Sequence, residues 1–366
     1  MPADWNDPLR PENAVTLVTG GQVYQGWKGV RITRSMETLS NSFQLTLSDE
    51  RDNLASPFPI NEFDECEVWI GTERVIKGFI GDANPSFGAA SRDLSVSGFD
   101  AVQDLVECSE FYGELAGLSL LELARKLAAP FGLEVSVSPG LSIGEKFPMI
   151  RVAPGETAWS VIEKYCKKRA VLAVSDGNGG VLLTRAGKDR ATGKLAQEDM
   201  TAGGGKFSAK DRHSTYKILA QQAPTDDFGG ALATQLNGSA KDAGVPRFRP
   251  LVISAGGSDP GSLAARAKWE ASVRAGRSRS IEGVKVEGWR QPAAGSGVPP
   301  LWKPNLLVPI ESPWLRVNGE MILSKVDFIL DDQEGFISDL TFARKEAFEL
   351  IPEPELGIDS AIEEEE

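Results

Sequence analysis

The chain has 366 residues, of which 41% are hydrophobic and 25% charged. Its formal net charge of −13 argues against a surface that grips nucleic acid through clustered Lys and Arg. A single histidine, His213, excludes most histidine-based triads and metal sites. No apolar run approaches the ~20 residues that cross a bilayer, and the N-terminus lacks the basic and apolar regions of a signal peptide. We therefore expect a protein made in a cytoplasm, without stable membrane insertion.

The first hundred residues are predicted to form strands. Apolar and polar residues alternate over 15–18, 29–36, 42–48, 66–70, 75–80 and 93–98. In 42–48, for example, Phe43, Leu45 and Leu47 share one face of a sheet. Short strands at hairpin spacing predict a closed antiparallel barrel or sandwich.

Residues 101–205 change to a helical period and predict a small α+β domain. Asp100 is expected to cap a short helix over 101–107. Ser119 and Glu122 form a capping box before an apolar stripe, and Thr157 is expected to cap a helix from Ala158 to about Arg169. A hairpin follows over 171–174 and 181–184. The polar segment 186–210 is interpreted as a connector.

Strands are predicted again over 215–220, 281–289, 306–310, 314–317, 321–330 and 336–342. Between them we expect a mobile loop over 224–244 and a helix over 260–275, opened by Pro260 and stopped by Gly276. Residues 315–323 echo 68–76 as strand, tight turn and strand, which suggests an internal duplication. The acidic tail, 349–366, is expected to be disordered or loosely docked.

No catalytic, cofactor-binding or metal-binding residue stands out. Gly203–Lys206 lacks the Ser/Thr and the preceding strand of a phosphate loop, and Asp331–Gly335 lacks the ligand spacing of an EF-hand and is interpreted as a hairpin turn. The three cysteines (Cys66, Cys108 and Cys166) are expected to be buried thiols.

Two basic clusters lie near helix ends. They are Lys164, Lys167, Lys168 and Arg169, and then Arg274, Arg277 and Arg279. The first suits the negative end of a helix dipole. The second is interpreted as a solvated face, or as a contact with acidic groups of a neighbouring subunit.

Several sequence segments resemble those of the baseplate hub proteins of contractile phage tails, with the Mu type the nearest. They are 30–37, 42–45, 68–80 and 94–101, and the order of strand domain, small α+β domain and strand domain is also similar over essentially the whole chain. The resemblance implies an α+β, mainly β fold, with two similar antiparallel β-barrel domains and a small α+β domain between them. The expected domains are 1–100, 101–205 and 206–348, the last with the inserted helix 260–275, followed by the tail 349–366.

The resemblance also implies a homotrimer whose six barrels form a ring with a channel for DNA passage. Such a ring would join a sixfold tail tube to a threefold central spike. The implied partners are itself, the spike, the tail tube protein and other baseplate proteins, with no sequence-specific nucleic acid and no cofactor. The implied location is the virion, after assembly in the host cytoplasm. The resemblance carries no catalytic residues, so we expect no enzyme.

Two alternatives from other classes stay open. Residues 154–165 are similar to the opening of a LysM cell-wall module, although no second helix follows, and a packed helix with Trp159 and Ile162 inward is the other interpretation. The second alternative is a tail-associated enzyme that hydrolyses peptidoglycan through a pair of carboxylates, although the sequence singles out no such pair.

Overall fold

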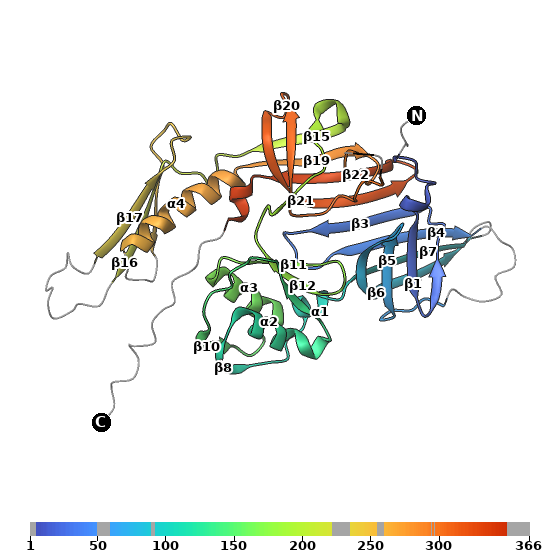
Figure 1. Cartoon of the computed structure of the whole chain (residues 1–366), viewed down its shortest axis with the longest axis horizontal. Coiled ribbons are helices and arrows are strands. Elements are labelled where there is room, and N and C mark those ends of the chain that lie inside the picture. Colours follow the sequence, from blue (N-terminus) through green and yellow to red (C-terminus); the bar gives the residue numbers. More distant parts are fainter. Residues whose placement is uncertain are drawn as a thin grey trace.

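The computed structural model describes residues 5–49, 59–88, 92–221, 235–254, 260–293, 295 and 297–349. Most of the regular structure is strand, and helices are few. Figure 1 shows one long sheet across the top of the molecule, a small domain with three helices beneath it, and a thin layer with a long helix at the end away from the N-terminus. Among the described residues no helix is long and apolar enough to span a membrane. The fold class is α+β, mainly β, as predicted.

The first strand region confirms all six segments predicted from alternation. It contains β1 (Val15–Thr19), β2 (Gln22–Tyr24), β3 (Gly29–Ser35), β4 (Ser42–Asp49), β5 (Glu65–Ile70), β6 (Glu73–Phe87) and β7 (Arg92–Asp100). Phe43 and Leu45 are buried against Ile32 in one core, whereas Gln44 is exposed. The alternation therefore forms because one face of each strand is removed from water.

The middle domain packs two helices over short strands. It contains α1 (Gln103–Glu107), β8 (Gly113–Leu118), α2 (Leu120–Ala128), β9 (Val135–Val137), β10 (Phe147–Val152), α3 (Ala158–Lys168), β11 (Leu172–Ser175) and β12 (Val181–Thr184). The Ser119 and Glu122 capping box is present, and the Thr157 hydroxyl accepts a hydrogen bond from the Ser160 amide at 3.2 Å. These caps, the helices and the β11–β12 hairpin were predicted correctly.

Residues 186–207 are not a free connector. They contain β13 (Asp189–Arg190), β14 (Leu195–Ala196) and β15 (Met200–Phe207), which pair with strands of the long sheet. The prediction failed because β15 is polar and glycine-rich. Seven of its eight residues are exposed, so neither face of the strand needs apolar residues, and its sequence does not alternate. The predicted domain limits after residues 100 and 348 stay predictions.

The second strand region adds β19 (Arg279–Glu287), β20 (Leu306–Ser312), β21 (Val317–Asp331) and β22 (Gly335–Ala343) to β15. The predicted strand over 314–317 is wrong, since residues 313–316 form the turn between β20 and β21. The prediction that 315–323 repeats the strand, turn and strand of 68–76 is therefore also wrong. Asn318, Gly319 and Glu320 lie inside β21, where they pair with β20, and make no turn.

An outer layer carries the longest helix of the part of the chain that the structure describes. Strands β16 (Thr215–Gln221), β17 (Gln235–Lys241) and β18 (Pro250–Ser254) form a small sheet, and α4 (Pro260–Arg277) covers it. The helix was predicted, although Gly276 lies within it and does not stop it. The predicted loop over 224–244 is wrong for 235–241, which is β17; residues 222–234 lie outside the described part of the chain.

The two strand regions repeat one strand order. The first runs β3-β4-β7-β6-β5 across the sheet, and the second runs β15-β19-β22-β21-β20, with antiparallel pairing throughout. The corresponding strands also follow one another in the same order along the chain, and β6 and β21 each have 15 residues. A duplication is thus present in the fold, but in other segments than those predicted. Closure of either region into a barrel stays a prediction.

The two regions join where β3 pairs with β21, so the sheet is continuous between them (Figure 1). Arg290 forms a second tie. Its side chain is 3% exposed, and its guanidinium donates to Asn13 Oδ1 and to Glu73 Oε1, both at 3.0 Å. Because a buried cation is stable only when paired, this residue fixes the start of the chain against the second region.

Candidate assembly surfaces

Among the described residues, the side chains that could serve catalysis or metal binding do not gather at one site. His213 is half-buried against Tyr216, with ring centroids 5.8 Å apart, and its Nδ1 has no hydrogen-bond partner among the described residues. Within the same residues no three His, Cys, Asp or Glu side chains gather as metal ligands would. Burial raises the pKa of the Cys66 and Cys166 thiols to about 12, whereas Cys108 is exposed, contrary to expectation.

The two loops considered for ligands have structural roles. Gly203–Lys206 lies within β15. Asp331 turns the β21–β22 hairpin, since its Oδ1 accepts from the amides of Gln333 and Glu334 at 2.8 and 2.6 Å. This confirms the interpretation of Asp331–Gly335 as a hairpin turn.

The LysM-like segment packs into the middle domain. Ile162 is fully buried, and Trp159 is half-buried against the same core. The chain then forms the β11–β12 hairpin, so no second helix completes such a module. This supports the packed-helix interpretation.

The predicted basic clusters are largely engaged within the chain. Lys164 and Lys167 lie 3.4 and 3.0 Å from Glu156 and Glu163. Arg274 is 3.0 Å from Glu270, and Arg277 Nε donates to the Ala347 carbonyl at 3.4 Å. The contact with a neighbouring subunit stays a prediction.

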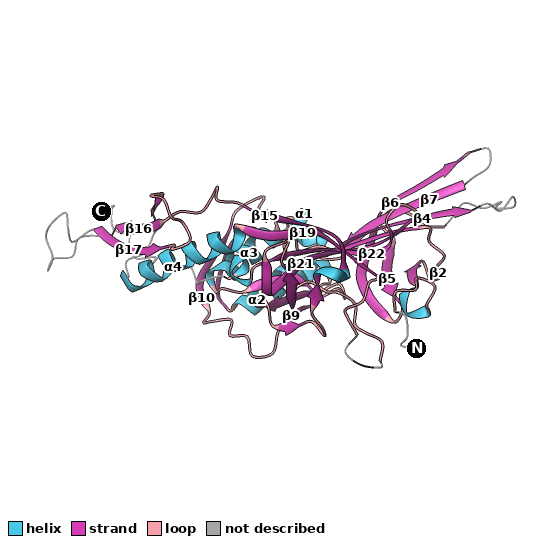
Figure 2. Cartoon of the chain, turned by 90° about the horizontal axis from the view of Figure 1, so that it is seen from above, coloured by secondary structure: helices cyan, strands magenta, loops and turns pink. Residues whose placement is uncertain are grey.

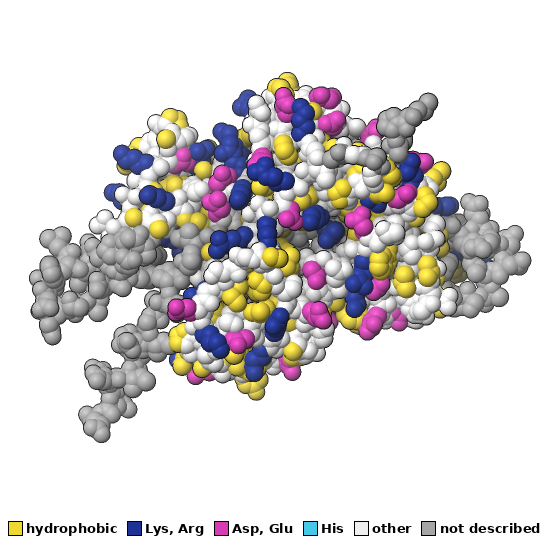
Figure 3. Space-filling model, viewed as in Figure 1, with side chains coloured by type: hydrophobic (Ala, Val, Ile, Leu, Met, Phe, Trp, Pro, Cys, Tyr) yellow, Lys and Arg dark blue, Asp and Glu magenta, His cyan; other side chains and the backbone are white. Residues whose placement is uncertain are grey.

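Two pockets lie between the middle domain and the second strand region. The first is lined by Arg169, Arg185, Lys188 and Lys345, and the second by Lys167, Lys206, Arg277 and Arg279. Figure 3 shows Lys and Arg side chains gathered across the middle of this face. Glu37, Glu163, Glu282 and Glu349 line the same pockets, and Lys167 and Lys206 lie 3.0 and 3.6 Å from Glu163 and Glu282, so much of the basic charge is balanced within the chain.

A buried polar joint connects the first strand region with the middle domain. The Asp100 carboxylate accepts hydrogen bonds from Ser175 Oγ and from Asn41 Nδ2, the latter at 3.1 Å. Burial raises the pKa of Asp100 to about 6, although these hydrogen bonds oppose the rise. Burial also lowers the pKa of nearby Arg34, and the Asp100, Glu73 and Asp176 carboxylates oppose that change.

This joint corrects one expectation. Asp100 does not cap α1, because its side chain points into the joint and the N-cap position is Val102, which has no capping side chain. Nothing in the local sequence distinguishes the two roles, since Ser175 lies 75 residues away.

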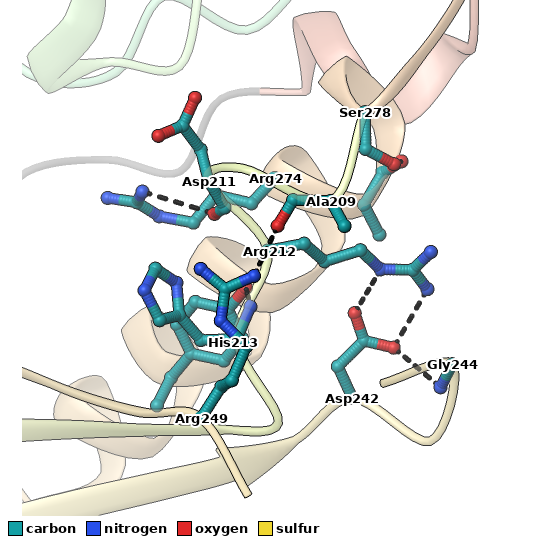
Figure 4. Close-up of polar contacts among 11 residues, drawn as sticks. Ala209, Asp211, Arg212, His213, Asp242, Gly244, Arg249, Arg274 and Ser278 are labelled. Carbon is teal, nitrogen blue, oxygen red and sulfur yellow. Dashed lines mark hydrogen bonds and ion pairs between the residues drawn. The ribbon is translucent and has the colours of Figure 1, made fainter. Parts of the chain in front are cut away.

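A second polar cluster holds the outer layer at its base (Figure 4). Arg212 donates to both oxygens of Asp242, at 2.5 and 2.9 Å, which lowers the pKa of Asp242. Arg249 donates to the carbonyls of Ala209 and Lys210 at 2.6 and 2.9 Å. Paired guanidinium and carboxylate groups of this kind give rigid, directional ties. They fix the segment between β15 and β16 to the layer.

Two of the open strand edges among the described residues carry exposed aromatic side chains. Among the described residues, β15 has a pairing strand on one side only, β19, and the outer half of β6 pairs only with β7. Phe87 on β6 is 89% exposed, and Phe207 on β15 is 44% exposed. Open backbone edges with exposed aromatic residues are typical of surfaces that pair with another chain. The sequence did not reveal these edges, since they follow from the order of strands in the sheet.

These features define a β-rich assembly protein, and the comparisons with known proteins agree. Three family models match: "Mu phage baseplate assembly protein GpP-like, N-terminal" over 14–100, "Baseplate hub protein gp44-like, second domain" over 102–185, and "Mu phage baseplate assembly protein GpP, fourth domain" over 260–351. The baseplate hub protein gp44 of Escherichia phage Mu is 30% identical over 93% of this chain and 90% of its own length. The chain therefore belongs to the baseplate hub family of Mu-type phage tails.

Solved structures agree with this assignment. The 43 kDa tail protein of prophage MuSo2 from Shewanella oneidensis is 32% identical and has a TM-score of 0.80, over 92% of this chain and all of its own. The E. coli c3393 protein, a component of the type VI secretion system similar in structure to the T4 tail proteins gp27 and gp5, shares the fold. Its TM-score is 0.58 at 8% identity, over 93% of this chain and 79% of its own.

Proposed function

We propose that this baseplate hub protein is a homotrimeric ring that joins the sixfold tail tube of a contractile tail to its threefold central spike. The observation that supports it is the repeated strand order, since three chains with two similar regions each supply six similar units around one axis. The same ring keeps threefold symmetry for the spike. Its partners would be the tube protein, the spike and other baseplate proteins.

In this proposal the ring surrounds a channel for DNA in the virion, after assembly in the host cytoplasm. Three chains of net charge −13 would give the ring a strongly acidic character. Like charges repel within a Debye length of about 8 Å at physiological salt, so an acidic wall would keep DNA from adhering during passage. The protein would act through its interfaces and not as an enzyme.

Light scattering after size-exclusion chromatography tests the proposal. The expected molar mass is three times that of one chain, with a ring visible by electron microscopy. A stable monomer at micromolar concentration, without rings, would contradict it. A peptidoglycan zymogram tests the non-catalytic part, since clearing around the purified protein would favour the muralytic alternative.

A further inference from the structure

One pocket lies where the middle domain meets α4 and has a volume of about 620 Å³. Its walls are the segments that follow β9, α3 and β12, Trp269 of α4, and the last described residues, which include η4 (Lys345–Phe348). Figure 2 shows α4 next to α3 at this place. The pocket therefore lies between two parts of the chain whose sheets are separate.

The basic residues of this pocket are not matched by acidic ones. Arg185, Lys188 and Lys345 line it and are exposed, and among the described residues none of the three forms an ion pair. The Lys188 ammonium donates instead to the Pro139 carbonyl at 2.7 Å. The only acidic residue of the described lining is Glu349. In the neighbouring pocket, by contrast, two lysines lie beside glutamates of the same lining. The first pocket therefore keeps a surplus of positive charge.

The described part of the chain ends at the wall of the same pocket. Trp269 Nε1 of α4 donates to the Glu349 carbonyl at 2.6 Å. Phe348, one residue earlier, is half-buried against the apolar cluster around Ile322. Residues 350–366, the acidic tail beyond this point, lie outside the described residues. The position of Glu349 means that the tail leaves from the pocket.

The sequence of the tail complements the pocket. Residues 350–366 contain no Lys or Arg, and their acidic residues are Glu353, Glu355, Asp359, Glu363, Glu364, Glu365 and Glu366. An extended chain spans up to about 3.5 Å per residue, so Glu355 can lie up to about 20 Å from Glu349. Glu353 and Glu355 are thus the first carboxylates that the chain can bring to the cations of the pocket.

We infer that the acidic tail folds back into this pocket of its own chain, where Glu353 and Glu355 meet Arg185 and Lys188. Each exposed ion pair contributes little alone, but the tail is tethered at Glu349. A segment on so short a tether has an effective concentration in the millimolar range, so several weak pairs together hold it. A separate acidic peptide in dilute solution has no such advantage.

A docked tail bridges two parts of the molecule. It leaves from Trp269 of α4 and reaches Arg185, just beyond β12, so it links the outer layer with the middle domain. It also neutralises cations that would otherwise attract phosphates or other anions. Because the contact lies within one chain, it is expected in a monomer as well as in a ring.

Carbodiimide coupling of the full-length protein tests this contact, because the reagent joins a carboxylate to a lysine amine only where the two groups meet. Mass spectrometry after trypsin cleavage identifies the joined residues. We expect Lys188 to be joined to Glu353 or Glu355. The exposed Lys126 and Lys241 lie outside the pocket and serve as controls. An undocked tail, which can extend over about 55 Å, would couple to them as readily as to Lys188.

A matched pair of arginine variants tests the charge of the pocket. Arg185→Glu is expected to lower coupling at Lys188 by about fivefold, since an exposed ion pair changes an equilibrium by up to about that factor. Arg247→Glu, at an exposed arginine of the outer layer, makes the same change in net charge and is expected to leave the coupling unchanged. Salt at 1 M, where the Debye length is about 3 Å, is expected to reduce coupling at Lys188 to that of the control lysines.

Variants of the tail test which carboxylates make the contact. Glu353→Gln with Glu355→Gln is expected to remove the coupling at Lys188. Glu365→Gln with Glu366→Gln makes the same change in charge and is expected to retain it. The opposite result would overturn the contact assigned to Glu353 and Glu355.

Isotope labelling identifies the chain that supplies the tail. Labelled and unlabelled chains are mixed in denaturant and refolded together before coupling. Joined peptides that are wholly labelled or wholly unlabelled support a contact within one chain, whereas mixed pairs overturn it in favour of a tail from a neighbouring copy. Coupling at Lys188 no stronger than at Lys126 and Lys241, or unchanged by Arg185→Glu, would show that the tail does not dock in this pocket.

Discussion

At the residue scale, Asp100 shows how a single carboxyl group couples two parts of the chain. It is 1% exposed and has hydrogen bonds from Asn41 of the first strand region and Ser175 of the middle domain. Its pKa of about 6 lies above that of an unfolded aspartate, about 4, so the folded chain binds the proton more tightly. The charge on Asp100 therefore destabilises the fold as the pH rises.

This sign gives a testable pH dependence. Between pH 4 and 7 the Asp100 contribution to the free energy of unfolding is expected to fall by about 2 kcal/mol, because a shift of one pKa unit corresponds to about 1.4 kcal/mol and an unfolded aspartate is already about half ionised at pH 4. Asp100→Asn removes this term, so the stability of the variant relative to the wild-type chain rises over that range. Denaturant unfolding at several pH values measures the difference.

The control for Asp100 is Glu110→Gln, which changes an exposed carboxylate just beyond α1. It removes a carboxylate that lies outside the buried joint and is the reference for the loss of one surface charge. A constant difference for Asp100→Asn would show that Asp100 does not titrate in this range.

At the element scale, the outer layer depends on close backbone packing and on one ion pair. A Cβ on Gly238 of β17 would overlap the backbone of Leu263 in α4, so the strand and helix can approach only because that residue is glycine. The small, polar sequence of β17 follows from this approach. It is also why 235–241 was predicted as a loop, since its burial depends on a helix that lies later in the chain.

The ion pair gives the prediction for this layer. Asp242→Asn is expected to lower the stability of the layer by about 2 kcal/mol, because Arg212 loses a charged acceptor in a site where its side chain is 19% exposed. Since the pKa of Asp242 is lowered by Arg212, this stabilisation is present above the pH where an unfolded aspartate titrates and is lost as the pH falls.

Hydrogen exchange of the backbone amides in β16, β17 and β18 measures the effect, as it reports local opening. Faster exchange confined to these strands is the expected result. The exposed Lys241→Gln in the same layer serves as control. Equal protection in both variants would mean that the pair contributes nothing to holding the layer.

At the scale of the whole molecule, the sequence predicted the strands of the first region and the helices well, because burial on one face leaves a period in the residues. Strand order leaves no such period. The duplication was sought in a local phrase, 315–323, whereas it resides in which strands lie side by side. The open edges of β6 and β15 could not be predicted for the same reason.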